Sequence, residues 1–323
     1  MPVADTRRPV AIVLGGMGMA GRLRAAGVPC EIFDAVELGT PPAGFRAEIA
    51  VGGYGAPEGV VPWLDGVRWV HLTGAGTDNV PDEVFVDRVV THSAGVNAFP
   101  VAEFAFATML AFEKHLPASW VTEPPVRWAR ARLGTLEGRR LGIVGLGHIG
   151  TTLAAMARPF EMEIRATTGS QADGERGGVA LTDLRSLFAW ADHIVLAARG
   201  GPATRHMIDA TVLADAKPGM HLVNIGRGSL VDEDALRVAL DDGRIALASL
   251  DTVEREPLPA GHWLFRHPSV RLSPHVAYAS PATGGRGVER FERNLLRYVD
   301  GEPLGDVVTP QIDPRSTRLT VAD

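Results

Sequence analysis

The chain of 323 residues has few of the residues that define several protein classes. Cys30 is the only cysteine, which excludes an intrachain disulfide and a thiolate metal cluster. No apolar run approaches the roughly 18 residues that a membrane-spanning helix needs. Only two lysines are present and the net charge is −6, which argues against a surface for nucleic acid or anionic membranes. We therefore expect an enzyme-like protein of the reducing cytoplasm, without a metal site, a nucleic-acid partner or a membrane partner.

The length and the apolar pattern indicate two α/β domains. The chain is too long for one ordinary hydrophobic core, and a hydrophobic content of 46% is that of a globular protein. Short apolar runs alternate with helical patterns within residues 10–94, and again within residues 141–284. Strands that alternate with helices form parallel, doubly wound sheets, so each region is predicted to contain one.

The pattern Gly-x-Gly-x-x-Gly follows an apolar run at residues 140–150 (RLGIVGLGHIG). The run is typical of a buried strand, and the residues after it are typical of a helix. Gly145 permits a tight turn, Gly147 lets the backbone approach a pyrophosphate, and Gly150 lets helix and strand pack closely. The phosphates would then bind the free amides of the helix N-terminus. A glycine-rich turn of another α/β protein is the alternative, and the motif alone does not decide between them.

A second copy of the pattern lies at residues 16–21 (GMGMAG). In a dinucleotide unit, the residue that ends the next strand, about 20 positions on, contacts the ribose. That residue is Thr168 after the copy that ends at Gly150, at a spacing of 18. After the first copy the next apolar segment ends at Asp34, only 13 positions on. We therefore predict that the first copy is a structural turn and the second copy the dinucleotide site.

Three polar residues follow predicted strands of the second region. Arg227 follows VNIG, Glu256 lies five residues after Asp251, and His275 follows VRLS. Strand ends of a parallel sheet meet at one edge, so these side chains are expected to converge. Reduction of a 2-keto acid needs a proton donor, a cation and a carboxylate that keeps the imidazole charged. A surface ion pair and a packed histidine are the alternatives for each residue alone, and their joint placement favours chemistry.

Two glycine-rich loops follow strands of the first region, where open α/β sheets bind ligands. They are residues 52–55 and 74–79, and both are candidate substrate loops, although a common turn is the favoured interpretation of the first. Tyr54 in the first loop and Tyr278, close after His275, are candidates to line a substrate pocket. Aromatic side chains are nevertheless more often part of a core.

These motifs resemble the D-isomer-specific 2-hydroxyacid dehydrogenases, a family that includes glyoxylate/hydroxypyruvate reductases and phosphoglycerate dehydrogenase. The resemblance extends from about Trp69 to Gly301. The residues that carry it are 74–79, Asn97 with 101–103, 141–150, 224–228, 251–257 and 273–275.

The resemblance implies a set of site residues. Arg227, Glu256 and His275 match the family's catalytic triad, and Asp251 matches the residue that orients the nicotinamide carboxamide. The implied cofactor-binding residues are Gly145, Gly147, His148, Ile149, Gly150, Thr168, Ser170, Arg199, Thr204, Ile225 and Asp251. The candidate substrate-binding residues are Tyr54, Ala75, Gly76 and Arg227, with the backbone of Ala75 and Gly76 on the substrate carboxylate.

The resemblance also implies the domain organisation. The family's substrate domain is discontinuous, so we expect a flavodoxin-like substrate domain of residues 1–97 with 285–323. A Rossmann-type cofactor domain would span residues 98–284. Members of the family are usually homodimers, and we expect the same of this chain.

The choice of cofactor depends on two departures from the family's pattern. Residues 199–202 (RGGP) replace the family's usual Pro-Leu-Thr. Thr168 stands where most NAD-dependent members carry Asp, and the lack of that Asp removes the main barrier against the 2′-phosphate of NADP. Thr168 and Ser170 can donate hydrogen bonds to that phosphate, and Arg199, after the adjacent strand, would meet its charge. We therefore favour NADP over NAD, and use of either cofactor is the alternative.

The expected function is hydride transfer between NAD(P)H and a small 2-keto acid, or from the D-2-hydroxy acid in reverse. A non-catalytic nicotinamide-sensing binding protein on the same fold is one alternative. Methyl transfer from S-adenosylmethionine is another, but it gives no reason for Arg227, Glu256 and His275 to coincide.

Overall fold

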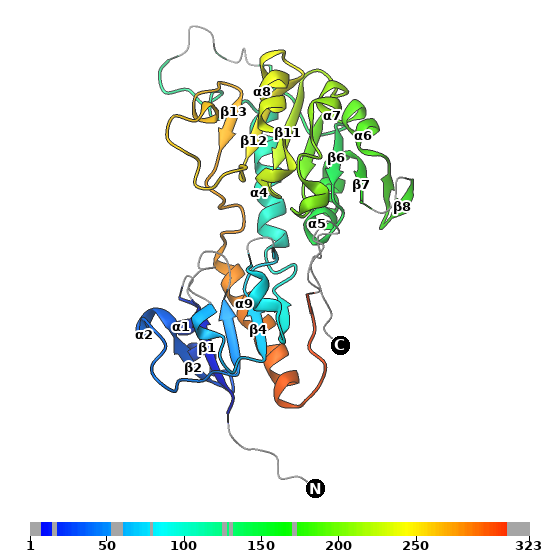
Figure 1. Cartoon of the computed structure of the whole chain (residues 1–323). Coiled ribbons are helices and arrows are strands. Elements are labelled where there is room, and N and C mark those ends of the chain that lie inside the picture. The colour runs from blue at the N-terminus through cyan, green and yellow to red at the C-terminus, as the bar shows by residue number, and fades with distance from the viewer. Residues whose placement is uncertain are drawn as a thin grey trace. The chain divides into compact units, whose positions relative to one another are not determined.

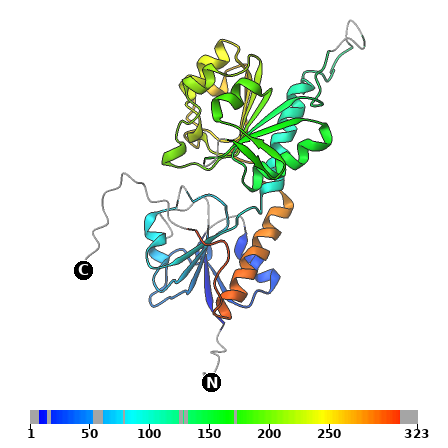
Figure 2. The same cartoon turned by 90° about the vertical axis from the view of Figure 1, so that its right-hand side faces the viewer.

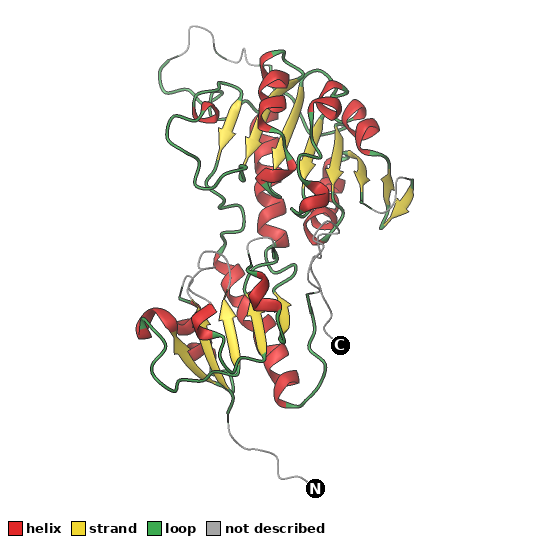
Figure 3. Ribbon diagram, in the orientation of Figure 1, coloured by secondary structure: helices red, strands yellow, loops and turns green. Residues whose placement is uncertain are grey.

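The computed structural model describes residues 8–14, 18–52, 61–77, 80–124, 128, 132–169 and 173–308. The chain divides into a first unit, Met1–Val96 with Ser280–Asp323, and a second unit, Asn97–Ala279. Each unit contains a sheet flanked by helices (Figure 3). The predicted α/β class with two doubly wound, largely parallel sheets is therefore confirmed. Among the described residues, no helix is long and apolar enough to cross a membrane.

The first unit is built on a five-stranded sheet of order β2-β1-β3-β4-β5, in which every pair is parallel. This is the flavodoxin-like order. Its described elements are β1 (Val10–Leu14), α1 (Met19–Ala26), β2 (Glu31–Asp34), α2 (Ala35–Leu38), β3 (Ile49–Gly52), the 3₁₀ helix η1 (Val61–Trp63), β4 (Trp69–Leu72), η2 (Asp82–Phe85), β5 (Val89–His92) and α9 (Pro281–Val299).

Alternation along β1 shows why this sheet is buried on both faces. Ala11 and Val13 pack with residues of α1 and α9, including Phe291, whereas Ile12 and Leu14 pack on the opposite face. Successive side chains of a strand point to opposite faces, so one short apolar strand contributes to two cores. Figure 2 shows α9, in orange, running along the sheet of this unit.

Helix α9 begins earlier than the amphipathic pattern predicts. The amphipathic pattern is clear only from Gly287, but the helix starts at Pro281, where the hydroxyl of Ser280 accepts a hydrogen bond from the Ala282 amide at 3.2 Å. Proline suits a first helical position and serine suits a cap. The expected return of the chain to the first domain at residue 285 consequently falls inside this helix.

The second unit contains an eight-stranded sheet of order β13-β12-β11-β10-β6-β7-β9-β8. Its described elements are α4 (Ala98–Glu113), β6 (Arg140–Val144), α5 (His148–Ala157), η3 (Arg158–Phe160), β7 (Glu163–Thr167), β8 (Gly174–Arg176), β9 (Val179–Leu181), α6 (Leu184–Trp190), β10 (His193–Leu196), η4 (Pro202–Thr204), α7 (Ala210–Ala214), β11 (Met220–Asn224), η5 (Gly228–Leu230), α8 (Glu233–Asp241), β12 (Ile245–Leu250), η6 (Trp263–Phe265) and β13 (Val270–Leu272) (Figure 1).

The strands from β9 to β12 are arranged as in a Rossmann sheet. Taking β6 as the first strand, the order β9-β7-β6-β10-β11-β12 corresponds to 3-2-1-4-5-6. The chain leaves in opposite directions from β6 and β10, so a crevice at the carboxyl ends of these two strands is the expected ligand position. The sequence did not predict the hairpin of β8 and β9, whose strands have only three residues each.

Helices cover both faces of the second sheet. Helices α6, α7 and α8 pack with one set of strand residues, such as Val144 and Ile194. Helices α4 and α5 pack with the alternate residues, such as Ile143 and Val195. The apolar composition of α4 follows from this arrangement, because the helix packs against α5 and β11 of the same unit.

Candidate active site

The turn after β6 has the geometry that a dinucleotide-binding turn requires. Gly145 has a φ of 97°, and a Cβ there would lie 2.8 Å from the backbone of Ala198, just after β10. A Cβ on Gly150 would lie 2.2 Å from the carbonyl oxygen of Gly145. A Cβ on Gly147 would meet no atom of the described residues within 4 Å. The first and third glycines are therefore needed for packing within the chain, whereas the second leaves open space where a ligand approaches.

The open position leads directly into a helix N-terminus. Helix α5 begins at His148, and no side chain caps it. Gly147 and His148 are exposed, and among the described residues their amides donate to no acceptor. Unpaired amides at the positive end of the helix dipole bind anions. The residues present thus fit the pyrophosphate of a dinucleotide.

Arg227, Glu256 and His275 follow three neighbouring strands, β11, β12 and β13. Nδ1 of His275 lies 2.7 Å from Oε2 of Glu256. Burial raises the pKa of the Glu256 carboxyl, but the hydrogen bond and charge of His275, the Val253 amide and the charge of Arg227 together hold it below its usual value. The structure therefore brings Glu256 and His275 into contact and places the Arg227 charge within electrostatic range of Glu256.

The Asp251 carboxylate organises the loop that carries His275. It accepts hydrogen bonds from the Ser273 hydroxyl at 2.6 Å and from the amides of Val276 and Ala277 at 2.9 and 3.0 Å. The amide of His275 donates to the carbonyl oxygen of Asp251 at 2.9 Å, and His275 itself has a φ of 54°. A non-glycine residue in this region needs such support. Asp251 thus holds the imidazole in place, and its expected contact with the nicotinamide remains a prediction.

A second set of contacts fixes the turn at Arg227. The side chain of Asn224 donates to the carbonyl oxygen of Arg227 at 2.9 Å and accepts from the Gly226 amide at 3.2 Å. Gly200 lies beneath the arginine, since a Cβ there would be 2.8 Å from Cγ of Arg227. Ile225, a predicted cofactor-binding residue, is only 6% exposed and packs in the core. Ile225 therefore offers little surface to a ligand.

The strand order corrects one expectation about the ribose pocket. Thr168 follows β7, whose neighbours in the sheet are β6 and β9, whereas Arg199 follows β10. Neighbouring strands are about 4.8 Å apart, so the ends of β7 and β10 are separated by roughly 10 Å. The expectation that Arg199 follows a strand adjacent to that of Thr168 is wrong. The Thr204 hydroxyl donates to the carbonyl oxygen of Arg199 at 2.8 Å, and Ser170 lies outside the described residues.

The candidate substrate residues belong to both units. Ala75 and Gly76 are half-buried in the loop after β4 of the first unit, and Tyr54 lies outside the described residues. In the second unit the Tyr278 ring lies edge-on to the imidazole of His275, with centroids 6.2 Å apart. Tyr278 is therefore next to the candidate proton donor, as its position in the sequence suggested.

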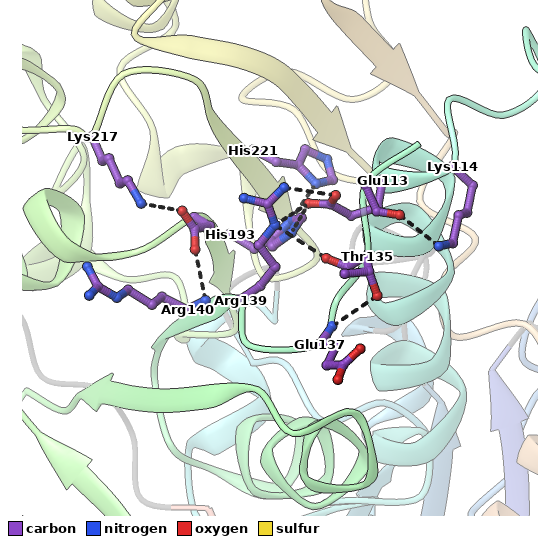
Figure 4. Close-up of polar contacts among 11 residues, drawn as sticks. Glu113, Lys114, Thr135, Glu137, Arg139, Arg140, His193, Lys217 and His221 are labelled. Atoms are coloured by element: carbon purple, nitrogen blue, oxygen red, sulfur yellow. Dashed lines mark hydrogen bonds and ion pairs between the residues drawn. The ribbon is translucent and has the colours of Figure 1, made fainter. Parts of the chain in front are cut away.

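A buried polar chain in the second unit was not predicted (Figure 4). Glu113 of α4 is 4% exposed, and its Oε1 lies 3.1 Å both from Nε2 of His193 and from Nε of Arg139. Nδ1 of His193 lies 3.2 Å from Nδ1 of His221, whose Nε2 lies 2.9 Å from Oγ of Ser249. Burial holds the pKa of His221 well below its usual value, so this ring is neutral. His193 and His221 lie near the N-terminal ends of their strands, whereas the triad residues follow the C-terminal ends of theirs. This row of hydrogen-bonded side chains therefore supports the packing of α4 and is separate from the triad.

Known proteins resemble this chain over most of its length. Residues 106–277 match the family described as D-isomer specific 2-hydroxyacid dehydrogenase, NAD binding domain. The 2-ketogluconate reductase of Gluconobacter oxydans is 33% identical over 266 residues, which cover 81% of this chain and 84% of the relative. The D-3-phosphoglycerate dehydrogenase of Synechocystis sp. is 35% identical over 216 residues, which cover 65% of this chain but only 39% of that longer protein.

A solved structure extends the similarity to both units. It is the NADPH-dependent glyoxylate/hydroxypyruvate reductase of Sinorhizobium meliloti in complex with NADP and malonate. The two chains are 29% identical with a TM-score of 0.76, and the match covers 93% of this chain and 97% of the other.

Proposed function

The chain belongs to the D-isomer specific 2-hydroxyacid dehydrogenase family, and we propose that it transfers a hydride between NAD(P)H and a small 2-keto acid. In the reverse direction it would oxidise the D-2-hydroxy acid. The observation that carries the proposal is the 2.7 Å contact between His275 and Glu256 in the unit that also holds the dinucleotide turn. The substrate domain and the cofactor domain would correspond to the first and second units.

We assign the proton transfer to His275. When bound, NAD(P)H would supply the hydride that reduces the carbonyl carbon. Nδ1 of His275 donates to the Glu256 carboxylate, so Nε2 is the atom that gives its proton to the carbonyl oxygen. Because the pKa of Glu256 is lowered, its carboxylate stays charged near neutral pH and stabilises the imidazolium before transfer. In oxidation, the neutral Nε2 would take the hydroxyl proton back.

Arg227 is assigned to the substrate carboxylate and to the oxygen that gains negative charge. A guanidinium offers two parallel donors, which suit a carboxylate better than a single ammonium does. The hydrogen bond from Asn224 holds the backbone carbonyl of Arg227, and the absence of a side chain on Gly200 leaves room for Cγ of Arg227. We expect Arg227→Lys to raise KM for the keto acid and to lower kcat, because it keeps the charge and loses the paired donors. An effect on kcat alone would contradict the carboxylate role.

The proposal is tested by the absorbance of NAD(P)H at 340 nm with glyoxylate, hydroxypyruvate and larger 2-keto acids. Steady oxidation of the cofactor with at least one of them is expected. A nicotinamide-sensing binding protein would bind the cofactor without turnover. A decline in kcat/KM with increasing size of the keto acid would indicate that Tyr278, next to His275, restricts the pocket.

We propose that NADP is preferred to NAD. The support is the absence of a carboxylate at Thr168, since an acidic residue there would repel a 2′-phosphate. Thr168→Asp should lower the ratio of kcat/KM with NADPH to kcat/KM with NADH. Thr168→Val is the control, because it keeps the size of the side chain and introduces no charge. A tenfold or larger preference of the unaltered enzyme for NAD would refute the proposal.

Arg199→Ala tests whether the exposed guanidinium of Arg199 reaches the 2′-phosphate despite the intervening strand. Loss of about 1.5–3 kcal/mol in NADP binding, with NAD binding unchanged, would assign it a charged hydrogen bond. Unchanged NADP binding would assign the selectivity to position 168 alone.

We also propose that the chain forms a homodimer. Trp120, Val121 and Leu133, between α4 and β6, are 69%, 59% and 48% exposed. Large exposed apolar side chains that gather in one segment indicate an interaction surface. Light scattering coupled to gel filtration should give the mass of two chains, and Trp120→Ser should reduce it. A monomeric mass at micromolar concentration would contradict the proposal.

A further inference from the structure

We propose that His92 positions the loop after β4 so that the backbone amides of Ala75 and Gly76 can bind the carboxylate of the substrate. The inference rests on the proposed function, because a 2-keto acid brings the carboxylate that this loop would bind. It adds a positioning residue for that reaction, and every contact that supports it lies within the first unit.

The imidazole of His92 contacts the loop directly. His92 is the last residue of β5 and is 9% exposed, and its Nδ1 lies 2.9 Å from the carbonyl oxygen of Ala75. A carbonyl oxygen only accepts hydrogen bonds, so Nδ1 carries the hydrogen and donates it. The amide of Ser93, the next residue, donates to the carbonyl oxygen of Gly74 at 3.1 Å. Two successive carbonyl groups of the loop are therefore held by the end of β5.

The directions of these carbonyl groups determine the directions of the amides. In a trans peptide, the carbonyl group and the following N–H point to opposite sides. The amides of Ala75 and Gly76 consequently point away from the end of β5. Among the described residues neither amide has an acceptor, and both residues are half-buried. Successive unpaired amides that face one way form a concavity that binds anions, and two such amides match the two oxygens of a carboxylate.

The loop needs an external support because it is rich in glycine. Gly74 and Gly76 flank Ala75, and glycine permits backbone rotations that other residues resist. Without the contact to His92, the peptide between Ala75 and Gly76 is free to rotate, and its amide loses a defined direction. The hydrogen bond from the imidazole therefore orients the proposed carboxylate site.

His92 is itself held firmly by the chain around it. Its amide donates to the carbonyl oxygen of Asp306 at 3.1 Å, and the Asp306 carboxylate pairs with Arg290 of α9. Arg290 also donates to the carbonyl oxygen of Ala94 at 3.2 Å. On the other side, the Ser93 hydroxyl lies 3.1 Å from Nε2 of the buried His71. The imidazole thus projects from backbone that is fixed on both sides, so it can hold the loop.

Two amide substitutions separate a positioning role from a merely structural one. In His92→Asn, the side-chain nitrogen takes the place of Nδ1 and can still donate to Ala75. In His92→Gln, the nitrogen takes the place of Nε2 and cannot. We expect the Gln variant to raise KM for the keto acid roughly tenfold, the scale of one neutral hydrogen bond. The Asn variant should stay within about threefold of the unaltered enzyme on the same scale.

Three further measurements complete the test. Cofactor affinity should be the same in both variants, because the dinucleotide turn belongs to the second unit. The dissociation constant of oxamate, an unreactive analogue of a 2-keto acid, should follow KM in the cofactor-loaded enzyme. Thermal unfolding checks that the variants fold, and His92→Leu replaces the Gln variant if it does not, since Leu matches Asn in size and offers no donor.

The outcomes distinguish this inference from the proposed function. Equal KM values in the unaltered enzyme and the Gln variant, or equal increases in the Asn and Gln variants, overturn the role of His92 while 2-keto acid reduction stands. If the unaltered enzyme neither reduces a 2-keto acid nor binds oxamate, the proposed function fails and the inference fails with it. Rescue by Asn and loss with Gln supports both.

Discussion

The two Gly-x-Gly-x-x-Gly turns of this chain differ in the described surroundings of the third glycine. A Cβ on Gly150 would lie 2.2 Å from the carbonyl oxygen of Gly145, whereas a Cβ on Gly21 would meet none of the described residues within 4 Å. Helix α5 therefore packs tightly on its turn, while no described residue crowds Gly21 of α1. The third glycine of the second turn is thus needed for packing within the chain, and the letter pattern alone does not show this.

Two acidic residues that stand at strand ends also differ in their use. Asp34, at the end of β2, is the cap of α2, where its carboxylate accepts a hydrogen bond from the Val36 amide at 2.9 Å. Asp251, after β12, instead fastens the loop that carries His275. The presence of an acidic residue after a strand therefore does not identify a ribose site, because its hydrogen bonds can be satisfied by the chain itself.

The buried polar groups show a third difference between the units. In the first unit, the Thr91 hydroxyl accepts from Trp69 and contacts Nδ1 of His71 at 2.8 Å, and burial lowers the pKa of His71 to about 3. These three hydrogen-bonded side chains therefore carry no charge near pH 7. In the second unit, Glu113 and Arg139 form a charged pair. Loss of one partner of the charged pair should therefore destabilise the second unit more than loss of one neutral partner destabilises the first.

The largest expected effect is on turnover. His275→Ala should lower kcat by roughly 10²–10⁴, the usual contribution of a positioned acid, because the hydride acceptor loses its proton donor. Cofactor affinity should remain near normal, since the turn at residues 145–150 is untouched. His267→Ala is the matched control: this histidine pairs with Asp241 away from the triad. Turnover within a few-fold of normal in the His275 variant would show that the proton comes from elsewhere.

The largest change in stability is expected at the pair of the buried Glu113 and the half-exposed Arg139. Glu113→Ala should lower the free energy of unfolding by about 3 kcal/mol, because it leaves the fully buried His193 without its partner. Glu37→Ala removes the exposed pair with Arg24 in the first unit and should cost at most about 1 kcal/mol. Denaturant unfolding measures both values. Equal losses would contradict the contrast between the units.

The same pair predicts a dependence on pH. Burial raises the pKa of Glu113, but the hydrogen bond from His193 and the charge of Arg139 bring it below its usual value. The stabilisation is therefore complete above the ordinary glutamate pKa of about 4.3 and is lost as pH falls through the lower folded value. The difference in unfolding free energy between the unaltered protein and Glu113→Gln should shrink below about pH 4. A constant difference would show that the charge contributes nothing.

A smaller effect separates the two glycine turns directly. Gly150→Ala should destabilise the protein by about 2 kcal/mol and weaken cofactor binding, because the added methyl meets backbone that cannot easily move. Gly21→Ala should stabilise it by up to about 1 kcal/mol, since alanine favours a helix and no described residue lies within 4 Å of the added methyl. Fluorescence titration with NADPH and thermal unfolding give both quantities. Similar losses in the two variants would refute the difference in packing.

The smallest expected effect concerns the two aspartates. Asp251→Asn should cost about 1.5 kcal/mol of stability and lower kcat, because an amide has one oxygen for the donors that the carboxylate now accepts. Asp34→Asn should change neither, since asparagine caps a helix as well as aspartate does. The comparison fails if Asp251→Asn leaves both stability and kcat unchanged.

Much of the fold could be predicted because its signals are local. Strands β6, β10, β11 and β12 are short apolar runs, and parallel strands buried on both faces need such runs. The choice between the two glycine patterns came from chain length, since a crossover helix requires a minimum number of residues before the next strand. The candidate triad followed from a rule of parallel sheets, that carboxyl ends share one edge, and the contact between His275 and Glu256 agrees with it.

Sheet order and hydrogen-bond partners depended on the tertiary structure. No local pattern shows that β9, rather than β10, lies beside β7, so the place of Arg199 was misjudged. Likewise, the sequence does not show which groups the polar side chains of Asp251, His92 and Glu113 contact. Their partners, Ala277, Ala75 and His193, come from other segments and are chosen by the packing of strands and loops. Residue spacing along the chain determines helices, strands and turns, whereas the role of a polar side chain depends on which distant backbone or side-chain group the folded core brings within about 3 Å.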